Sequence, residues 1–189
     1  MTLTTNEAAR AHLLVYDIPQ TAKLPNPSAF LWQIGARINL SCWIIPDRNV
    51  VRIPVADWRA RGAIVELVRF DEKDGDTIIR LARESIERHL HEIRDYTERC
   101  MNSALKKLAE VPTGDEVMMK KGKQATQVVT WRAKRDLERA MECALTFDLT
   151  ADVQHLFDAA RHTVAAQEKI AFDAVQRKMT AGQRDEVMS

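Results

Sequence analysis

The sequence predicts an α+β protein that has a small mixed domain in residues 10–71 and a helical domain in residues 76–180. Short apolar runs separated by proline, asparagine and glycine fill the first part, as in a sheet with short connections. The second part repeats apolar side chains at three- and four-residue spacing over long stretches, which is typical of amphipathic helices. Residues 1–9 and 181–189 continue neither pattern, so we expect flexible ends there.

The mixed domain begins with a predicted strand at 12–17, the short apolar run HLLVYD. Pro19 ends this strand, because proline supplies no backbone donor to a sheet. Residues 20–27 have the composition of a loop. From Ser28, a candidate cap, apolar side chains recur at helical spacing as far as Ile38 and predict an amphipathic helix.

Residues 38–45 form the second predicted strand, because apolar side chains alternate there and β-branched residues are frequent. The next four residues, PDRN, have turn chemistry, and 50–55 is the predicted return strand of a hairpin. Its Pro54 indicates an edge position or a strand end. A short helix at 56–61 and a strand at 63–70 complete the order β-α-β-β-α-β. This order predicts the ferredoxin-like, split βαβ arrangement, an antiparallel sheet with helices on one face.

Three long helices are predicted after the sheet domain, at 76–110, 124–147 and 150–179. Asp76 is the candidate N-cap of the first helix. At 1.5 Å per residue this helix is on the order of 50 Å long, so part of its apolar stripe must meet something other than a small sheet. Gly122 indicates that the second helix is stable only after that position.

Composition favours a folded protein of the cytoplasm. Hydrophobic residues make up 46% and charged residues 29% of the chain, which is ordinary globular composition. The three cysteines, Cys42, Cys100 and Cys143, are widely spaced and odd in number, which favours free thiols in a reducing compartment. No secretory signal and no apolar stretch of membrane-spanning length is visible, so we expect no membrane association.

The segment LLVYDIP…FLWQIGARINLSCWIIPDRN resembles the strand-helix-strand core of a ferredoxin-like superfamily. Its members include the CRISPR adaptation endoribonuclease-like proteins, the C-terminal part of PaaX-type repressors and the N-terminal domain of the chromate-resistance regulator ChrB. The shared features are an apolar strand that ends at Asp17, then Trp32, Gly35 and a second strand centred on Ser41-Cys42-Trp43 before Pro46.

The ChrB N-terminal domain is the most similar of these, because long helices follow the ferredoxin-like unit there too. In addition, the segment AKRDLERAMECALTFDL resembles a helix of that domain that enters an acidic-aromatic break. The resemblance covers about residues 12–175 and implies a regulatory protein that associates with nucleic acid.

Asp17 is the one candidate catalytic residue. In the adaptation-protein relatives an aspartate at this position lies at a dimer interface, where two copies can hold a divalent metal for phosphodiester cleavage. The resemblance therefore implies Mg²⁺ as a cofactor if the protein is a nuclease. We favour the simpler interpretation that Asp17 satisfies backbone donors in its turn, because Pro19 and a proline-rich loop replace the basic residues that follow this aspartate in nuclease-type members.

Basic side chains gather in residues 117–139, which carry seven basic and two acidic residues. The candidate nucleic-acid-binding residues of this cluster are Lys120, Lys121, Lys123, Arg132, Lys134 and Arg135, with Trp131 among them. Such a cluster can contact a phosphate backbone without reading its sequence, although a solvated helix face gives the same pattern. Arg48 and Arg52 on the predicted hairpin, with Arg59 and Arg61, form a second candidate surface.

No metal site is expected. His155, Asp158 and His162 share one helix face and are weak candidates, but helical metal ligands usually come at tighter spacing and with help from another helix. A polar helix face explains them better. Motifs for nucleotide hydrolysis, serine hydrolysis and dinucleotide binding do not occur, and we expect no other cofactor.

Three functions remain open from the sequence. The first is a non-catalytic, nucleic-acid-associated regulatory or accessory protein that binds DNA or RNA and forms a homodimer. The second is a metal-dependent endonuclease that uses Asp17 across such a dimer. The third is a helical scaffold that binds a protein partner through its long helices. We regard catalysis as the less favoured outcome.

Overall fold

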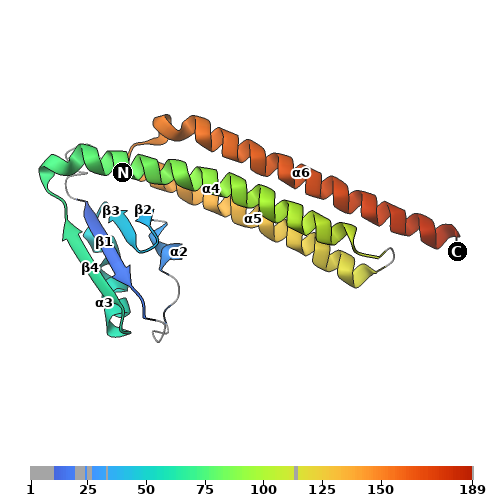
Figure 1. The fold of residues 1–189 in the computed structure, drawn as a ribbon, viewed down its shortest axis with the longest axis horizontal. Helices are drawn as coiled ribbons and strands as arrows, with labels where there is room; N and C mark the ends of the chain where they lie inside the picture. Colours follow the sequence, from blue (N-terminus) through green and yellow to red (C-terminus); the bar gives the residue numbers. More distant parts are fainter. Residues whose placement is uncertain (1–10, 20–23, 25–26, 33, 113–114, 189) are drawn as a thin grey trace. The chain divides into compact units, whose positions relative to one another are not determined.

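The computed structural model describes residues 11–188 except 20–23, 25–26, 33 and 113–114. Four strands and two short helices come first, and three long helices follow (Figure 1). In chain order the elements are β1 (His12–Asp17), α2 (Ser28–Leu31), β2 (Ala36–Asn39), β3 (Cys42–Ile45), the 3-10 turn η1 (Arg48–Val51), α3 (Arg52–Ala60), β4 (Ile64–Arg69), the 3-10 turn η2 (Glu72–Asp74), α4 (Gly75–Ala109), α5 (Glu116–Thr146) and α6 (Thr150–Met188).

The four strands form one antiparallel sheet in the order β2-β3-β1-β4. The predicted α+β class, with a sheet at the start and long helices after it, is confirmed. The first and last predicted strands are confirmed as β1 and β4. None of the helices in the described part of the chain combines the length and the apolarity that a membrane span needs.

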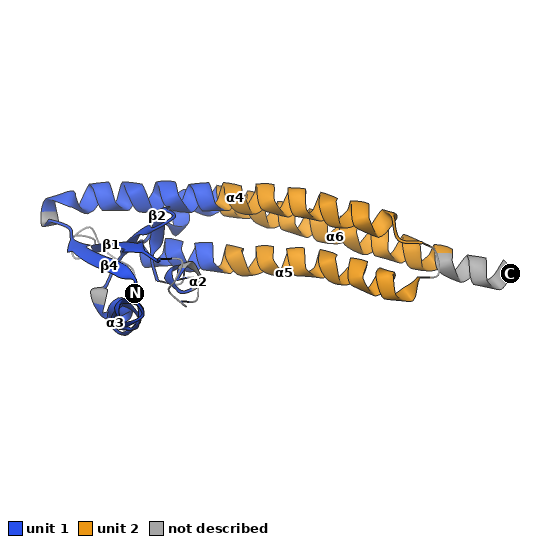
Figure 2. Cartoon of the chain, turned by 60° about the horizontal axis from the view of Figure 1, so that its bottom comes forward, with its two compact units in different colours: residues 1–89, 139–155 blue, residues 90–138, 156–189 orange. Residues whose placement is uncertain are grey.

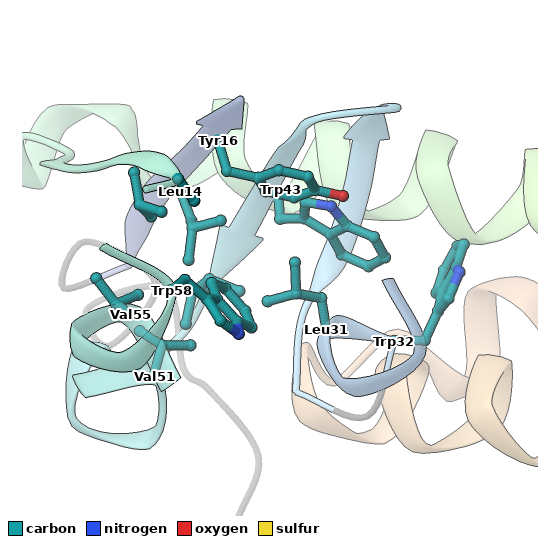
Figure 3. Packing of buried hydrophobic residues seen from close by; sticks show 11 residues of the cluster. Leu14, Tyr16, Leu31, Trp32, Trp43, Val51, Val55 and Trp58 are labelled. Atoms are coloured by element: carbon teal, nitrogen blue, oxygen red, sulfur yellow. The ribbon is translucent and has the colours of Figure 1, made fainter. Parts of the chain in front are cut away.

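One face of the sheet carries an aromatic core. Leu14 and Tyr16 of β1 alternate with exposed or half-buried neighbours, and Leu14 lies opposite Trp43 of β3. Side chains of α2, η1 and α3 complete the cluster, which Figure 3 shows in close-up. The Trp32 and Trp43 rings meet edge to face with centroids 5.0 Å apart. Edge-to-face contacts of this kind stabilise an aromatic pair beyond the effect of the surface area that the rings bury.

The predicted strand at 38–45 is wrong, because the chain reverses direction inside it. Residues 36–39 and 42–45 are β2 and β3 of a tight hairpin. The Asn39 side chain accepts a hydrogen bond from the Ser41 amide at 3.0 Å, which favours a turn at this point. The helix predicted from Ser28 is correspondingly short, since α2 ends at Leu31.

The predicted return strand at 50–55 is also wrong, because this segment is helical. Asp47 accepts a hydrogen bond from the Asn49 amide at 2.8 Å and so caps η1, which leads directly into α3. Pro54 is the third residue of α3, where the missing amide hydrogen costs no helical hydrogen bond. Val51, Val55 and Trp58 are buried at spacings of four and three residues. The helical spacing of the buried side chains therefore determined the structure of this segment, although its β-branched residues favour a strand.

The long helices differ from their predicted bounds mainly at their ends. Asp76 is not the N-cap, because α4 begins one residue earlier and places Asp76 in its first turn. α5 begins at Glu116 and contains Gly122, so the expected later start is wrong. α6 continues to Met188, past the predicted flexible end at 181. The other predicted flexible end, 1–9, lies outside the described residues.

The chain divides into two compact units, which are coloured separately in Figure 2. Unit 1 comprises residues 1–89 and 139–155, and unit 2 comprises residues 90–138 and 156–189. Each long helix therefore contributes one part to each unit. In unit 1 the Arg88 guanidinium donates to the backbone carbonyls of Arg37 at 3.0 Å and of Ile38 at 2.8 Å, and the Ser85 hydroxyl donates to the first of these.

Gly35 connects α2 to the hairpin at a point of very close approach. A Cβ atom at this position would lie 2.4 Å from the Ile44 carbonyl oxygen and 2.7 Å from Cδ1 of Ile45. The first of these atoms belongs to the backbone of β3 and cannot move aside by rotation. Only glycine fits here.

We therefore expect Gly35→Ala to lower the free energy of unfolding by about 2–3 kcal/mol, the cost of overpacking a rigid site. Urea denaturation followed by circular dichroism measures the change. Gly62→Ala is the matched control: Gly62 has φ 93° but nothing within 4 Å of its Cβ position, so only backbone strain of about 1 kcal/mol is expected. Equal stability of Gly35→Ala and wild type would contradict this packing.

Candidate nucleic-acid interface

The six basic candidates of the sequence all lie on α5, in the part that belongs to unit 2. The helix starts because the Asp115 carboxylate accepts a hydrogen bond from the Met118 amide at 2.9 Å. Gly122 lies in the second turn of α5, where α4 passes very close. A Cβ atom at this position would lie 2.8 Å from Cδ1 of Leu108 on α4. The close approach of α4 explains this glycine, so it does not delay the helix.

Lys120, Lys121 and Lys123 form an exposed group near the start of α5. Within the described part of the chain, no carboxylate forms an ion pair with any of the three. Their ammonium groups are therefore available to an external anion. Buried residues such as Val129 and Ala133 lie on the side of the helix away from Lys120 and Lys121, and Lys123 lies at the border of that buried side.

The three later candidates have partners inside unit 2. The Arg132 guanidinium lies 4.9 Å from the centre of the Tyr96 ring and donates to the Tyr96 hydroxyl at 3.3 Å. Burial raises the pKa of Tyr96, so this hydroxyl is neutral at physiological pH. Lys134 and Glu168 form an ion pair at 2.8 Å. An exposed pair of this kind contributes about 0–1 kcal/mol, so an incoming phosphate can compete for the lysine.

Trp131 is an exposed aromatic side chain between these basic residues, with 62% of its surface accessible. The Arg135 guanidinium lies 4.8 Å from the centre of its ring and also pairs with Asp136 at 3.2 Å. The other three tryptophans of the chain are buried. Trp131 is thus placed for contact with a ligand or partner and adds little to the core.

A groove of about 330 Å³ runs beside Trp131 between α5 and α6, within unit 2. Lys123 and Lys134 line it from α5, and Glu168 and Phe172 line it from α6. Phe172 is 62% exposed, as is Trp131. Phe172 was not predicted as a site residue, because Ala171 and Val175 already account for the apolar stripe of α6.

The second candidate basic surface lies on η1 and α3, because the segment predicted as a hairpin is helical. Arg52 is the exposed first residue of α3, and Arg48 lies in η1 with a side chain outside the described set. Arg59 donates from Nε to the Val65 carbonyl at 2.9 Å, and Arg61 pairs with Asp57 at 3.0 Å. Two of these four arginines therefore have structural contacts.

Asp17 is exposed at the end of β1, opposite Ile64 of β4. Among the described residues no group of three or more histidine, cysteine, aspartate or glutamate side chains is placed to hold a metal ion. His155 and His162 are exposed on α6, and Asp158 is half-buried there. Neither set forms a metal centre within the part of one chain that the structure describes.

The three cysteines are free thiols. Cys143 is buried in unit 1 and donates to the Gly35 carbonyl at 3.4 Å. Burial raises the pKa of the Cys143 thiol to about 12, and burial also raises the pKa of Cys42. At neutral pH the Cys143 thiol is protonated, so it is not a nucleophile.

We expect iodoacetamide at pH 8 to leave Cys143 unmodified in the folded protein, since the thiolate is the reactive form and a raised pKa depletes it. Peptide mass spectrometry measures the modification at each cysteine. The half-buried Cys100 serves as the reference that reacts in native buffer, and Cys42, whose pKa burial also raises, should react more slowly than Cys100. In urea all three cysteines should react, and native modification of Cys143 at the rate of Cys100 would refute its burial.

Comparison of the chain with protein-family models, with curated proteins and with solved structures found no match.

Proposed function

We propose that the protein binds DNA or RNA without catalysis, as a regulatory or accessory protein similar to the N-terminal domain of ChrB. The observation that carries the proposal is the exposed group of Lys120, Lys121 and Lys123 on the same helix as the exposed Trp131. Uncompensated ammonium groups attract phosphates, and their contacts release condensed counterions. An exposed aromatic ring about 12 Å further along the helix offers a surface to a base.

We propose a ferredoxin-like fold for the sheet domain as part of the same interpretation. The element order β1-α2-β2-β3-α3-β4 and the strand order β2-β3-β1-β4 support it. The aromatic cluster between the sheet and the helices α2 and α3 supports it as well. Residues of the motif that carries the family resemblance, among them Trp32 and Trp43, belong to that cluster.

A cytoplasmic location and a homodimer complete the proposal. Three free thiols, one of them buried, are typical of a reducing compartment. Val15, Ile64 and Val68 are exposed on β1 and β4. The register pairs Leu13 with Val68 and Asp17 with Ile64, so these apolar side chains share one face of the sheet and offer a surface to a second copy.

Two alternative functions can be distinguished from this one by experiment. A nuclease would require two Asp17 carboxylates to meet across a dimer, and cleavage of labelled RNA or DNA with Mg²⁺ that Asp17→Asn abolishes would favour it. A protein-binding scaffold is favoured by one observation, the exposed apolar side chains Val128, Trp131 and Phe172 on α5 and α6. Binding to such a partner would depend little on salt.

The proposal predicts salt-dependent binding that needs the three lysines. We expect the triple variant K120Q/K121Q/K123Q to bind a labelled oligonucleotide at least about tenfold more weakly at low salt. Its slope of log affinity against log salt should be less steep by roughly 2–3, because each lost phosphate contact removes about 0.7–0.9. Fluorescence anisotropy at several salt concentrations measures both quantities.

The matched control removes three exposed positive charges from unit 1, in the variant R69Q/K73Q/R80Q. It makes the same change in net charge and should keep most of the affinity. If the wild-type protein fails to bind at low salt, or if the control loses as much affinity as the triple lysine variant, the proposed interface is wrong.

A further inference from the structure

The groove between α5 and α6 presents two aromatic rings to solvent. Trp131 lies on one helix and Phe172 on the other, and both line the groove with 62% of their surface exposed. Large aromatic side chains are usually buried, so two of them at one groove indicate contact with a ligand or partner. Both lie within unit 2, as does the whole lining of the groove.

Most of the remaining lining is apolar, although two threonines contribute to it, as do the glutamines Gln127 and Gln176. The Thr126 hydroxyl donates to the Lys123 carbonyl at 2.8 Å, and the Thr130 hydroxyl donates to the Thr126 carbonyl at 3.3 Å. Both hydroxyl groups therefore donate to the backbone of α5 and are not free to donate to a ligand. Ala171 and Val175 add methyl groups from α6. Such a surface suits a flat apolar face and offers few groups that could read the edges of a base.

Positive charge lies at one end of this groove. Lys123 lines the groove, and Lys120 is its neighbour on the helix surface, three residues earlier, whereas Lys121 faces another side of α5. Trp131 follows Lys123 by eight residues, which is about 12 Å along a helix that rises 1.5 Å per residue. At the other end Lys134 and Glu168 neutralise each other at 2.8 Å. The occupant therefore combines apolar faces with a negative charge.

We infer that this groove binds unpaired nucleotides of single-stranded DNA or RNA. Bases stack on Trp131 and Phe172, and phosphates contact Lys123 and its helix neighbour Lys120. The inference rests on the proposed nucleic-acid binding and narrows its ligand. In a duplex the faces of the bases are covered by neighbouring bases, whereas an unpaired base can leave the stack and present its face to a side chain.

Charge complementarity favours this occupant over an apolar helix of a partner protein or of a second copy. A helix that filled the groove with apolar side chains would leave Lys120 and Lys123 without a counter-charge. A single strand supplies a base for each ring and phosphates for both lysines. Stacking on aromatic rings also tolerates any base, so the groove accepts many sequences.

The test compares a fluorescently labelled oligothymidine with a duplex of the same length at two salt concentrations. We expect the single strand to bind at least tenfold more tightly than the duplex. The variant W131L/F172L should lose about tenfold or more of the single-strand affinity, within the range of base stacking on aromatic residues. Its duplex affinity should stay unchanged, and W131F should retain most of the single-strand binding.

Intrinsic fluorescence gives a second readout. Trp32, Trp43 and Trp58 are at most 8% exposed, so quenching by an oligonucleotide reports on Trp131. We expect saturable quenching by the single strand, which F172L weakens. Both substituted side chains are exposed, so the variants should keep the circular dichroism spectrum and urea midpoint of the wild type.

Different experimental outcomes would contradict the groove inference and the proposed function. Equal affinity for single strand and duplex, unaffected by W131L/F172L but reduced by K120Q/K121Q/K123Q, would overturn this inference and leave the proposed function intact. Absence of binding to both oligonucleotides would overturn both. Concentration-dependent self-association that W131L/F172L abolishes, together with unchanged single-strand affinity, would assign the groove to a second copy of the chain.

Discussion

The apolar stripe of α4 is the feature on which both compact units depend. Its buried side chains recur at three- and four-residue spacing, from Ile78 and Ile86 in unit 1 to Leu90, Met101 and Leu108 in unit 2. Each such side chain stabilises its unit by about 1.5–3 kcal/mol when it is fully buried. In unit 2 the stripe is accompanied by buried residues of α5 and α6. The opposite face of α5 is thereby committed to solvent, and it carries Lys120 and Lys121, with Lys123 at its edge.

The candidate interface combines structural and ligand-facing roles on neighbouring turns of one helix. Arg132 and Arg135 contact the rings of Tyr96 and Trp131, which holds the guanidinium groups at defined positions. Both also pair with Asp136, at 4.0 Å and 3.2 Å, so their charge is partly compensated. Lys120, Lys121 and Lys123 have no such contacts among the described residues. Long-range attraction is thus expected from the lysines, while the aromatic rings determine which form of nucleic acid is retained.

Much of the fold could be predicted from periodicity, and the errors have physical causes. The long helices followed from repeated apolar spacing, whereas Val50, Val51 and Ile53 suggested a strand because β-branched residues prefer sheets in the absence of other information. This segment is helical because Asp47 caps it and because Val51 and Val55 are buried one helical turn apart. The lysine group was visible in the sequence. Phe172 was not, because the sequence alone cannot show that a helical residue beside the core faces a groove on the neighbouring helix.

The most direct test is a two-dimensional proton–nitrogen NMR titration of the tryptophan indole signals with an oligonucleotide. The chain has four tryptophans, and the spectrum of the W131F variant identifies the signal of Trp131. If nucleic acid binds on α5, the Trp131 signal shifts progressively and saturates, while the signals of the buried Trp32, Trp43 and Trp58 stay in place. Saturating shifts of the sheet-domain tryptophans with an unmoved Trp131 signal would place the binding surface elsewhere and contradict the proposed interface.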